Sequence, residues 1–158
     1  MTRGNARELA MQLIYSHTFL GEDPQQVVHS RLEEEYYGCL AQENEIYEEL
    51  PSRRQVKYLE QVVVGVHEEK DALNEIISKF SIGWDVTRIS RLSRTIMQLA
   101  IYEILHFEDV PENVAVSEAV RLTKKYDTDC ASFVNGILGS YLRSRQPVAE
   151  EAPVTEEV

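Results

Sequence analysis

Apolar residues along this chain recur with the spacing of α-helices. The clearest case is Val110–Leu142, where two helical patterns meet at a short acidic turn. In the first pattern Ala115, Ala119 and Leu122 recur at i, i+4 and i+7, the spacing of a stripe that faces a core. The second pattern places its inward positions at Val134, Ile137, Leu138, Tyr141 and Leu142. The stretch therefore predicts two consecutive helices, the first of which ends near Tyr126.

The turn between these helices is acidic. Asp127-Thr128-Asp129 reads as a turn, and Asp129 is the expected N-cap of the second helix because its carboxylate can accept hydrogen bonds from free helix amides. Phe133 then falls in the first turn of that helix, beside Ser132 and ahead of Asn135. The sequence therefore predicts an aromatic ring at the start of the last helix.

Gly136 follows Asn135 inside this helical pattern. Asn-Gly often forms a hairpin turn, but the 3.6-residue periodicity continues through it and favours a helix. A glycine within a helix costs about 1 kcal/mol relative to alanine. Gly136 therefore predicts either the close approach of another backbone or a ligand, or a tight helix–helix crossing.

The rest of the chain is predicted to be helical with one irregular connection. A capping box of Asn5 and Glu8 starts the first helix at Ala6, and Gly21 ends it. A second helix is predicted over 25–40, followed by an irregular connection over 41–52. A helix over 53–69 then continues to 80, either as a fourth helix or as an extension of the third. A turn over 81–85, in which Trp84 closes the core edge, leads to a central helix over 86–107 that forms the buried spine.

No segment alternates apolar and polar residues as a strand would, so the predicted fold class is all-α. The 158 residues suit a single domain over 1–146, in which 22–52 is an acidic, partly irregular segment. Residues 147–158 combine two prolines and four glutamates with few large apolar residues, which predicts an acidic disordered tail.

The charge of the chain is regional. The formal net charge of -11 argues against a nucleic-acid partner if it is spread evenly. However, residues 22–50 hold nine acids against the single base Arg31, and 147–158 hold four acids and no base. Without these two segments the remaining chain carries about +1. A locally basic or neutral binding face is therefore compatible with the composition.

The sequence carries no catalytic or metal-binding motif. Its four histidines are scattered without HExxH spacing, and no phosphate-binding glycine loop is present. Cys39 and Cys130 form no CxxC pair, which fits a reduced, cytoplasmic protein without a membrane span, a metal or a cofactor. Glu103, in the most apolar helix, is expected to pair with an arginine such as Arg88 or Arg91. An enzyme is not expected.

Three separated blocks of this sequence resemble one family. The run PENVAVSEAVRLTKKY…D…ASFVNGIL is similar to the C-terminal signature of the NusB family of transcription antitermination factors. ARELAMQLIY at 6–15 resembles that family's first helix, and RLSRTIMQLAIYEIL at 91–105 its central helix. The blocks occur in the family's order and span most of residues 3–142. The resemblance implies two small helical bundles packed at an angle around the long central helix.

The same resemblance implies an RNA-binding function. Proteins of this family bind the boxA element of nascent transcripts together with the ribosomal protein NusE, and the elongating RNA polymerase complex then resists termination. The matching positions here are Arg3, Arg7, Tyr15, Asp129 and Phe133. From their place beside Phe133, Ser132 and Asn135 are further RNA-binding candidates.

Two departures from the family pattern reduce the predicted RNA affinity. Gly4 and Asn5 stand where many relatives carry a denser arginine cluster, and Ser132 stands where a lysine is common. Each missing phosphate contact lowers the affinity and its salt dependence. The sequence therefore predicts weak binding to RNA by this chain alone.

A protein partner would then matter. The acidic segments suit a basic ribosomal protein, because complementary charge raises association rate and selectivity. Arg91, Arg94 and Gln98, predicted to be exposed on the central helix, are candidates for the partner face, with a solvated helix face as the alternative.

Two other functions are compatible with these patterns. One is a protein-only helical adaptor or homodimeric interaction module, in which the Phe133 region is buried at an interface. The other is an RNA-recognition domain similar to the NusB-like module of ribosomal RNA methyltransferases. A free-standing methyltransferase is not expected, since the sequence shows no Rossmann-type segment.

Overall fold

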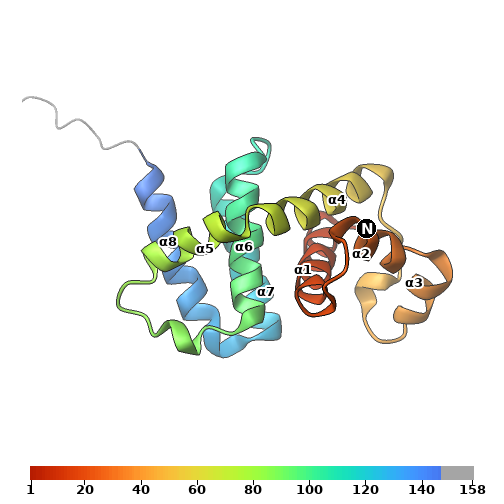
Figure 1. The fold of residues 1–158 in the computed structure, drawn as a ribbon, viewed down its shortest axis with the longest axis horizontal. Helices are drawn as coiled ribbons and strands as arrows, with labels where there is room; N and C mark the ends of the chain where they lie inside the picture. Colours follow the sequence, from red (N-terminus) through yellow and green to blue (C-terminus); the bar gives the residue numbers. More distant parts are fainter. Residues whose placement is uncertain (147–158) are drawn as a thin grey trace, which may run out of the picture.

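The computed structural model describes residues 1–146, and within them every regular element is helical (Figure 1). The predicted all-α class is confirmed. The predicted tail 147–158 lies outside the described residues. The elements in chain order are α1 (Arg3–Leu20), α2 (Pro24–Arg31), α3 (Glu34–Leu40), the 3₁₀ segment η1 (Glu45–Tyr47), α4 (Arg53–Glu68), α5 (Lys70–Phe80), the 3₁₀ segment η2 (Val86–Arg88), α6 (Arg91–His106), α7 (Glu112–Tyr126), the 3₁₀ segment η3 (Thr128–Cys130) and α8 (Ala131–Arg145).

The helices form two groups that share α6. Figure 1 shows α1, α2, α3 and the first half of α4 at one end and α5 and α8 at the other, with α6 upright between them and α7 packed alongside α6. The α6 helix packs against α1, α4, α5, α7 and α8, so it forms the predicted buried spine. Its fully buried side chains include Ile96, Met97 and Ile101. Each such side chain contributes about 1.5–3 kcal/mol by its removal from water.

Local signals set several helix ends. Gly21 ends α1 as predicted, with φ 63°, a left-handed conformation that glycine adopts at little cost. Ser52 and Gln55 form a capping box at the start of α4. The predicted cap at Asn5 is wrong: Thr2 is the N-cap, and its hydroxyl accepts a hydrogen bond from the Asn5 amide at 3.0 Å. The first helix therefore begins at Arg3, three residues earlier than predicted.

Two predicted long helices are divided. The helix expected over 25–40 is α2 and α3, and the break places Glu34 and Glu35 in the first turn of α3, where acidic side chains favour the helix dipole. The central helix expected over 86–107 is η2 followed by α6, because Ser90 caps α6 by accepting from the Ser93 amide at 3.0 Å. The irregular connection over 41–52 holds η1, whose Ile46 and Tyr47 are buried.

The side chain of Trp84 packs closely against α8 at Gly136. A Cβ at this position would lie 2.7 Å from Cζ2 of Trp84, so the glycine makes room for the indole. The close approach predicted from the sequence is present, but a side chain makes it, not a backbone or a ligand. Trp84 remains 37% exposed and contacts Phe133 edge to face, with ring centroids 4.6 Å apart.

Candidate nucleic-acid interface

Arg7 belongs to a largely buried ion pair. Its Nε donates to both carboxylate oxygens of Glu103, at 2.9 and 3.1 Å, and the Tyr58 hydroxyl donates to the same carboxylate. Burial raises the pKa of Glu103, and the Arg7 charge opposes that shift. Burial also acts to lower the pKa of Arg7, but Glu103 and its other anionic neighbours hold that pKa above its ordinary value. A phosphate would have to compete with Glu103 for this guanidinium.

The expected partner of Glu103 is therefore corrected. Arg88 ends η2, outside α6, and Arg91 is the first residue of α6, about three turns from Glu103 along the helix. Arg88 instead lies 3.5 Å from Asp85, and the partner of Glu103 comes from α1. Periodicity within one helix could not reveal a pair whose members are 96 residues apart.

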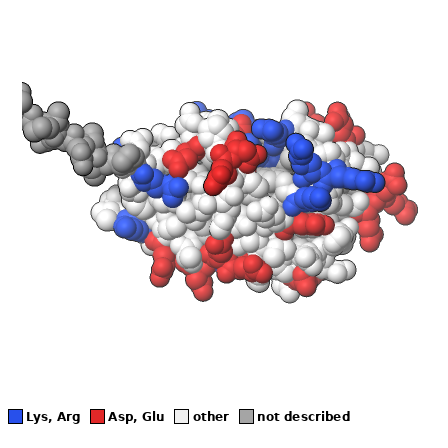
Figure 2. Space-filling view, turned by 90° about the horizontal axis from the view of Figure 1, so that it is seen from above, with Lys and Arg blue, Asp and Glu red and all other residues white. Residues whose placement is uncertain are grey.

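Arg3, in contrast, is exposed at the first position of α1. Among the described residues it has no carboxylate within 4 Å. The starts of α1 and α4 lie at the end of the molecule where Lys and Arg side chains gather in Figure 2. Of the two arginines predicted to bind RNA, Arg3 alone is exposed and unpaired within the described part of the chain.

Tyr15 and Arg91 lie on one patch. The Tyr15 ring contacts Phe19 edge to face at 4.9 Å, and the Arg91 guanidinium lies 5.5 Å from the centroid of Phe19. Phe19 is 52% exposed. The structure thus brings a predicted RNA residue and a predicted partner residue together through an aromatic ring that the sequence analysis missed. The i, i+4 spacing of Tyr15 and Phe19 is the signal that could have found it.

A second aromatic pair stands at the start of α8. Phe133 is half-buried in the first turn, where it contacts Trp84, and Ser132 and Asn135 beside it are exposed. Trp84 was predicted to close the core edge, and its contact with Phe133 adds it to this surface. The two pairs, Tyr15–Phe19 and Trp84–Phe133, are called the aromatic pairs below.

Asp129 is exposed in η3, and its predicted capping role is wrong. The residue before α8 is Cys130, which makes no side-chain capping bond, because η3 leads directly into the helix. The structural carboxylate is Asp127, which accepts from the Ser93 hydroxyl at 2.9 Å and from the Ser90 hydroxyl. The hydrogen bond from Ser90 contributes most to lowering the pKa of Asp127, and the bond from Ser93 lowers it further. The start of α6, whose Arg91 lies over Phe19, is thereby attached to the turn that leads to Phe133.

The candidate partner face on α6 is smaller than predicted. Gln98 is buried, and its side-chain amide donates to Asn74 Oδ1 at 2.8 Å. The prediction that Gln98 is exposed is wrong because α5 covers that side of α6. Arg91 is exposed and Arg94 is half-buried.

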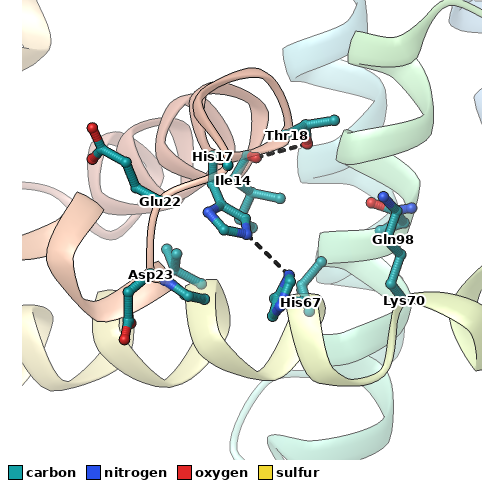
Figure 3. A pocket seen from close by; sticks show the side chains of 12 residues that line it. Ile14, His17, Thr18, Glu22, Asp23, His67, Lys70 and Gln98 are labelled. Carbon is teal, nitrogen blue, oxygen red and sulfur yellow. Dashed lines mark hydrogen bonds between the residues drawn. The ribbon is translucent and has the colours of Figure 1, made fainter.

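A cavity of about 440 Å³ lies between α1, α4 and the start of α5. His17 Nε2 and His67 Nδ1 meet in it at 2.9 Å, while the carboxylates of Glu22 and Asp23 point away from both rings (Figure 3). Burial, followed by the charge of His67, lowers the pKa of His17. Within residues 1–146 no three His, Cys, Asp or Glu side chains are grouped as metal ligands. The cavity therefore offers a histidine pair without a carboxylate placed to assist it.

No helix in the described part of the chain is both long and apolar enough to cross a membrane. The described residues thus form an all-helical protein in which two groups of helices share α6. Exposed aromatic rings and cations, not an acid–base pair, are its prominent groups.

The family follows from comparison with known proteins. Residues 4–143 match the model of the NusB family, and the chain belongs to that family. It is 37% identical over 150 residues to the transcription antitermination protein NusB of Symbiobacterium thermophilum, which covers 94% of each chain. The chain is therefore a member of a family of transcription antitermination factors and not an enzyme.

Solved structures agree with this assignment. NusB of T. maritima aligns with a TM-score of 0.73 and 26% identity, covering 93% of this chain and 94% of that one. A chain in a structure described as a plectonemic RNA supercoil aligns with a TM-score of 0.68, covering 90% and 94% of the two chains. At 22% identity the second likeness shows the fold alone.

Proposed function

We propose that this protein binds boxA-type single-stranded RNA of nascent ribosomal RNA transcripts together with the ribosomal protein NusE. The complex would act on the elongating RNA polymerase so that it resists termination. Membership of the NusB family supports this proposal.

The observation that carries the proposal is the position of the aromatic pairs. Arg91, the first residue of α6, lies over Phe19, while Ser90 bonds Asp127 in the turn that leads to Phe133. Single-stranded RNA is held by bases that stack on aromatic rings and by cations that contact its phosphates. The two pairs offer stacking faces, and Arg91 at the start of α6 lies beside the first of them.

The residues proposed for RNA binding change accordingly. Arg3, Tyr15, Ser132, Phe133 and Asn135 remain, since their side chains are exposed or half-exposed. Arg7 and Asp129 keep a smaller part, the first because of Glu103 and the second because its carboxylate repels phosphate. Phe19 and Trp84 join the set, and Arg91 moves to it from the partner face.

NusE would bind elsewhere on the surface. Its basic charge suits the acidic segment 22–52, which forms α2, α3 and η1 beside α1. This segment is attached to the RNA side of the molecule, because Tyr47 donates to Gln12 at 2.6 Å and Asn44 donates to Tyr126 at 3.4 Å. A partner on it would therefore lie next to the proposed RNA.

Fluorescence anisotropy tests the function. A labelled boxA-type RNA and a scrambled RNA are titrated with the protein, with and without NusE, at two salt concentrations. The proposal predicts weak but selective binding alone and tighter selective binding with NusE. If a folded sample binds neither RNA selectively in either condition, the proposal fails. Concentration-dependent dimerisation in light scattering would then favour the homodimeric module.

A further inference from the structure

Four exposed cations lie in the first two turns of α1 and α4. Arg3 comes from the first position of α1, and Arg53, Arg54 and Lys57 come from the first two turns of α4. Figure 2 shows Lys and Arg side chains gathered over this end of the molecule, although the whole chain carries a net charge of -11. These four residues are called the α1/α4 cation cluster.

Two contacts hold the two helix starts together. The Gln55 side-chain amide donates to the Met1 carbonyl at 2.8 Å, and its oxygen accepts from the Ser52 amide at 3.0 Å in the capping box of α4. One turn further, Tyr58 donates to Glu103, the carboxylate that Arg7 of α1 also binds. The position of the α4 cations relative to Arg3 is therefore fixed by the fold.

The cluster faces solvent and is not neutralised. Arg53 and Lys57 are four residues apart and Arg54 and Lys57 three apart, so they share the outer face of α4 while Leu59 points inward. Among the described residues, none of the four has a carboxylate within 4 Å. The neighbouring Glu49 is paired with the Met1 amino group at 3.1 Å. Like charges at this spacing repel one another, and a bound anion would relieve the repulsion.

The helix ends add to this field. The free amides at a helix N-terminus carry partial positive charge, which acidic residues in the first turn commonly offset. Neither α1 nor α4 has an acidic residue in its first turn. Both positive helix ends therefore remain next to the cluster.

We infer that the α1/α4 cation cluster holds phosphates of the bound RNA. The start of α4 would thus supply in space the cations that the first helix lacks at Gly4 and Asn5. This inference rests on the proposed function and adds Arg53, Arg54 and Lys57, which no pattern around the first helix indicates. From Arg3 to Phe19 the RNA would follow α1 for about 24 Å, at 1.5 Å per residue.

Two triple variants with the same change in charge test the inference. Arg53→Gln, Arg54→Gln and Lys57→Gln remove the α4 part of the cluster. The control removes three exposed cations of the other bundle by Lys70→Gln, Lys79→Gln and Arg143→Gln. At 0.15 M salt a charge acts over about 8 Å, so the control reports the effect of net charge alone.

Anisotropy is measured for boxA-type and scrambled RNA over a range of salt concentrations. The cluster variant should lose at least about tenfold in affinity for both RNAs, because phosphate contacts carry no sequence information. The slope of log affinity against log salt concentration should become less steep by about 2, because each of three lost phosphate contacts contributes about 0.7 to that slope. The control variant should stay within about twofold of wild type.

The outcomes separate the two proposals. If wild type binds boxA selectively and both triple variants bind it equally well, the cluster does not hold RNA, while the proposed function stands. If wild type shows no selective binding, both proposals are overturned. The melting temperatures of both variants are compared with wild type, and unchanged values assign a loss of affinity to lost contacts.

Discussion

Arg3 and Arg7 lie one turn apart on α1 but belong to regions of opposite kind. Arg7 is part of a buried polar layer, in which its guanidinium satisfies Glu103 and Tyr58. Arg3 is part of an exposed layer of cations and aromatic rings, and within residues 1–146 no carboxylate lies within 4 Å of it. The same residue type thus stabilises the fold in one place and is available for recognition in the other. What decides between the two is whether a distant segment brings a carboxylate to the side chain.

The largest expected effect separates these two arginines. Arg7→Ala leaves the Glu103 carboxylate buried without its cation, which should lower the free energy of unfolding by about 3–5 kcal/mol. Arg3→Ala should change it by less than about 0.5 kcal/mol, since nothing in the fold depends on this exposed side chain. Urea denaturation measures both. Equal stabilities of the two variants would contradict the division into buried and exposed layers.

Phe133→Ala tests the exposed layer directly. If the ring stacks a base, RNA affinity should fall by about 1–3 kcal/mol. Loss of a fully buried phenylalanine lowers the free energy of unfolding by about 3–5 kcal/mol. Phe133 is only half-buried, so its replacement should cost less than this. Tyr36→Ala, at an exposed aromatic residue of α3, is the control and should leave RNA affinity unchanged. Unchanged affinity in a folded Phe133→Ala variant would reject stacking.

Gly136 and Gly139 allow a finer comparison within α8. Gly136→Ala should cost about 1–2 kcal/mol of stability, because the new methyl group displaces the indole of Trp84 and overpacking outweighs the gain in helix propensity. Gly139→Ala meets only the flexible end of Arg143 at 3.4 Å and should gain about 0.5–1 kcal/mol. Trp84 is the only tryptophan, so its emission reports the displacement. A stabilised Gly136→Ala variant with unchanged emission would contradict the tight contact.

The smallest effect concerns the histidine pair in the cavity. The pKa of His17 is lowered, so between that pKa and the ordinary histidine value of about 6.5 the unfolded chain binds more protons than the folded one. The stability that this group contributes is present above that pH and is lost as the pH falls toward the folded pKa. The slope should be well below the one-proton limit of about 1.4 kcal/mol per pH unit, because solvent reaches the pair.

His17→Gln should flatten this part of the pH profile, and His29→Gln, at an exposed position, should not. The charges of His67 and Lys70 act to lower the pKa of His17 and that of Asp23 acts to raise it, so these groups set the size of the effect. Urea denaturation between pH 5 and pH 8 checks the profile. A wild-type profile that rises as the pH falls would contradict the assigned direction.

The sequence predicted those parts of the fold that depend on local chemistry. The end of α1 at Gly21, the helix from Arg53, and the helix ending at Tyr126 each follow from a cap or a period within a few residues. The break before α6 was missed because the apolar period runs through Ser90, whose side chain caps the helix. The Asn5 and Asp129 caps failed because Thr2 and η3 compete for the same amides.

The candidate site was predicted in part for the same reason. Tyr15 and Phe133 could be chosen from the family resemblance, and the structure leaves both partly exposed. The burial of Gln98 depends on α5, and the pairing of Arg7 depends on Glu103, contacts that no local pattern contains. The proximity of the α4 cations to Arg3 likewise follows only from how α1 and α4 pack.

The most direct test of the central claim is photo-crosslinking of an iodouridine-substituted boxA-type RNA to the full chain, followed by mass spectrometry of the crosslinked peptides. The account predicts that the RNA crosslinks to peptides from both aromatic pairs, one with Tyr15 or Phe19 and one with Trp84 or Phe133. If the RNA binds selectively but crosslinks only to α2, α3 or α5, the claim that RNA binds at the two aromatic pairs is contradicted.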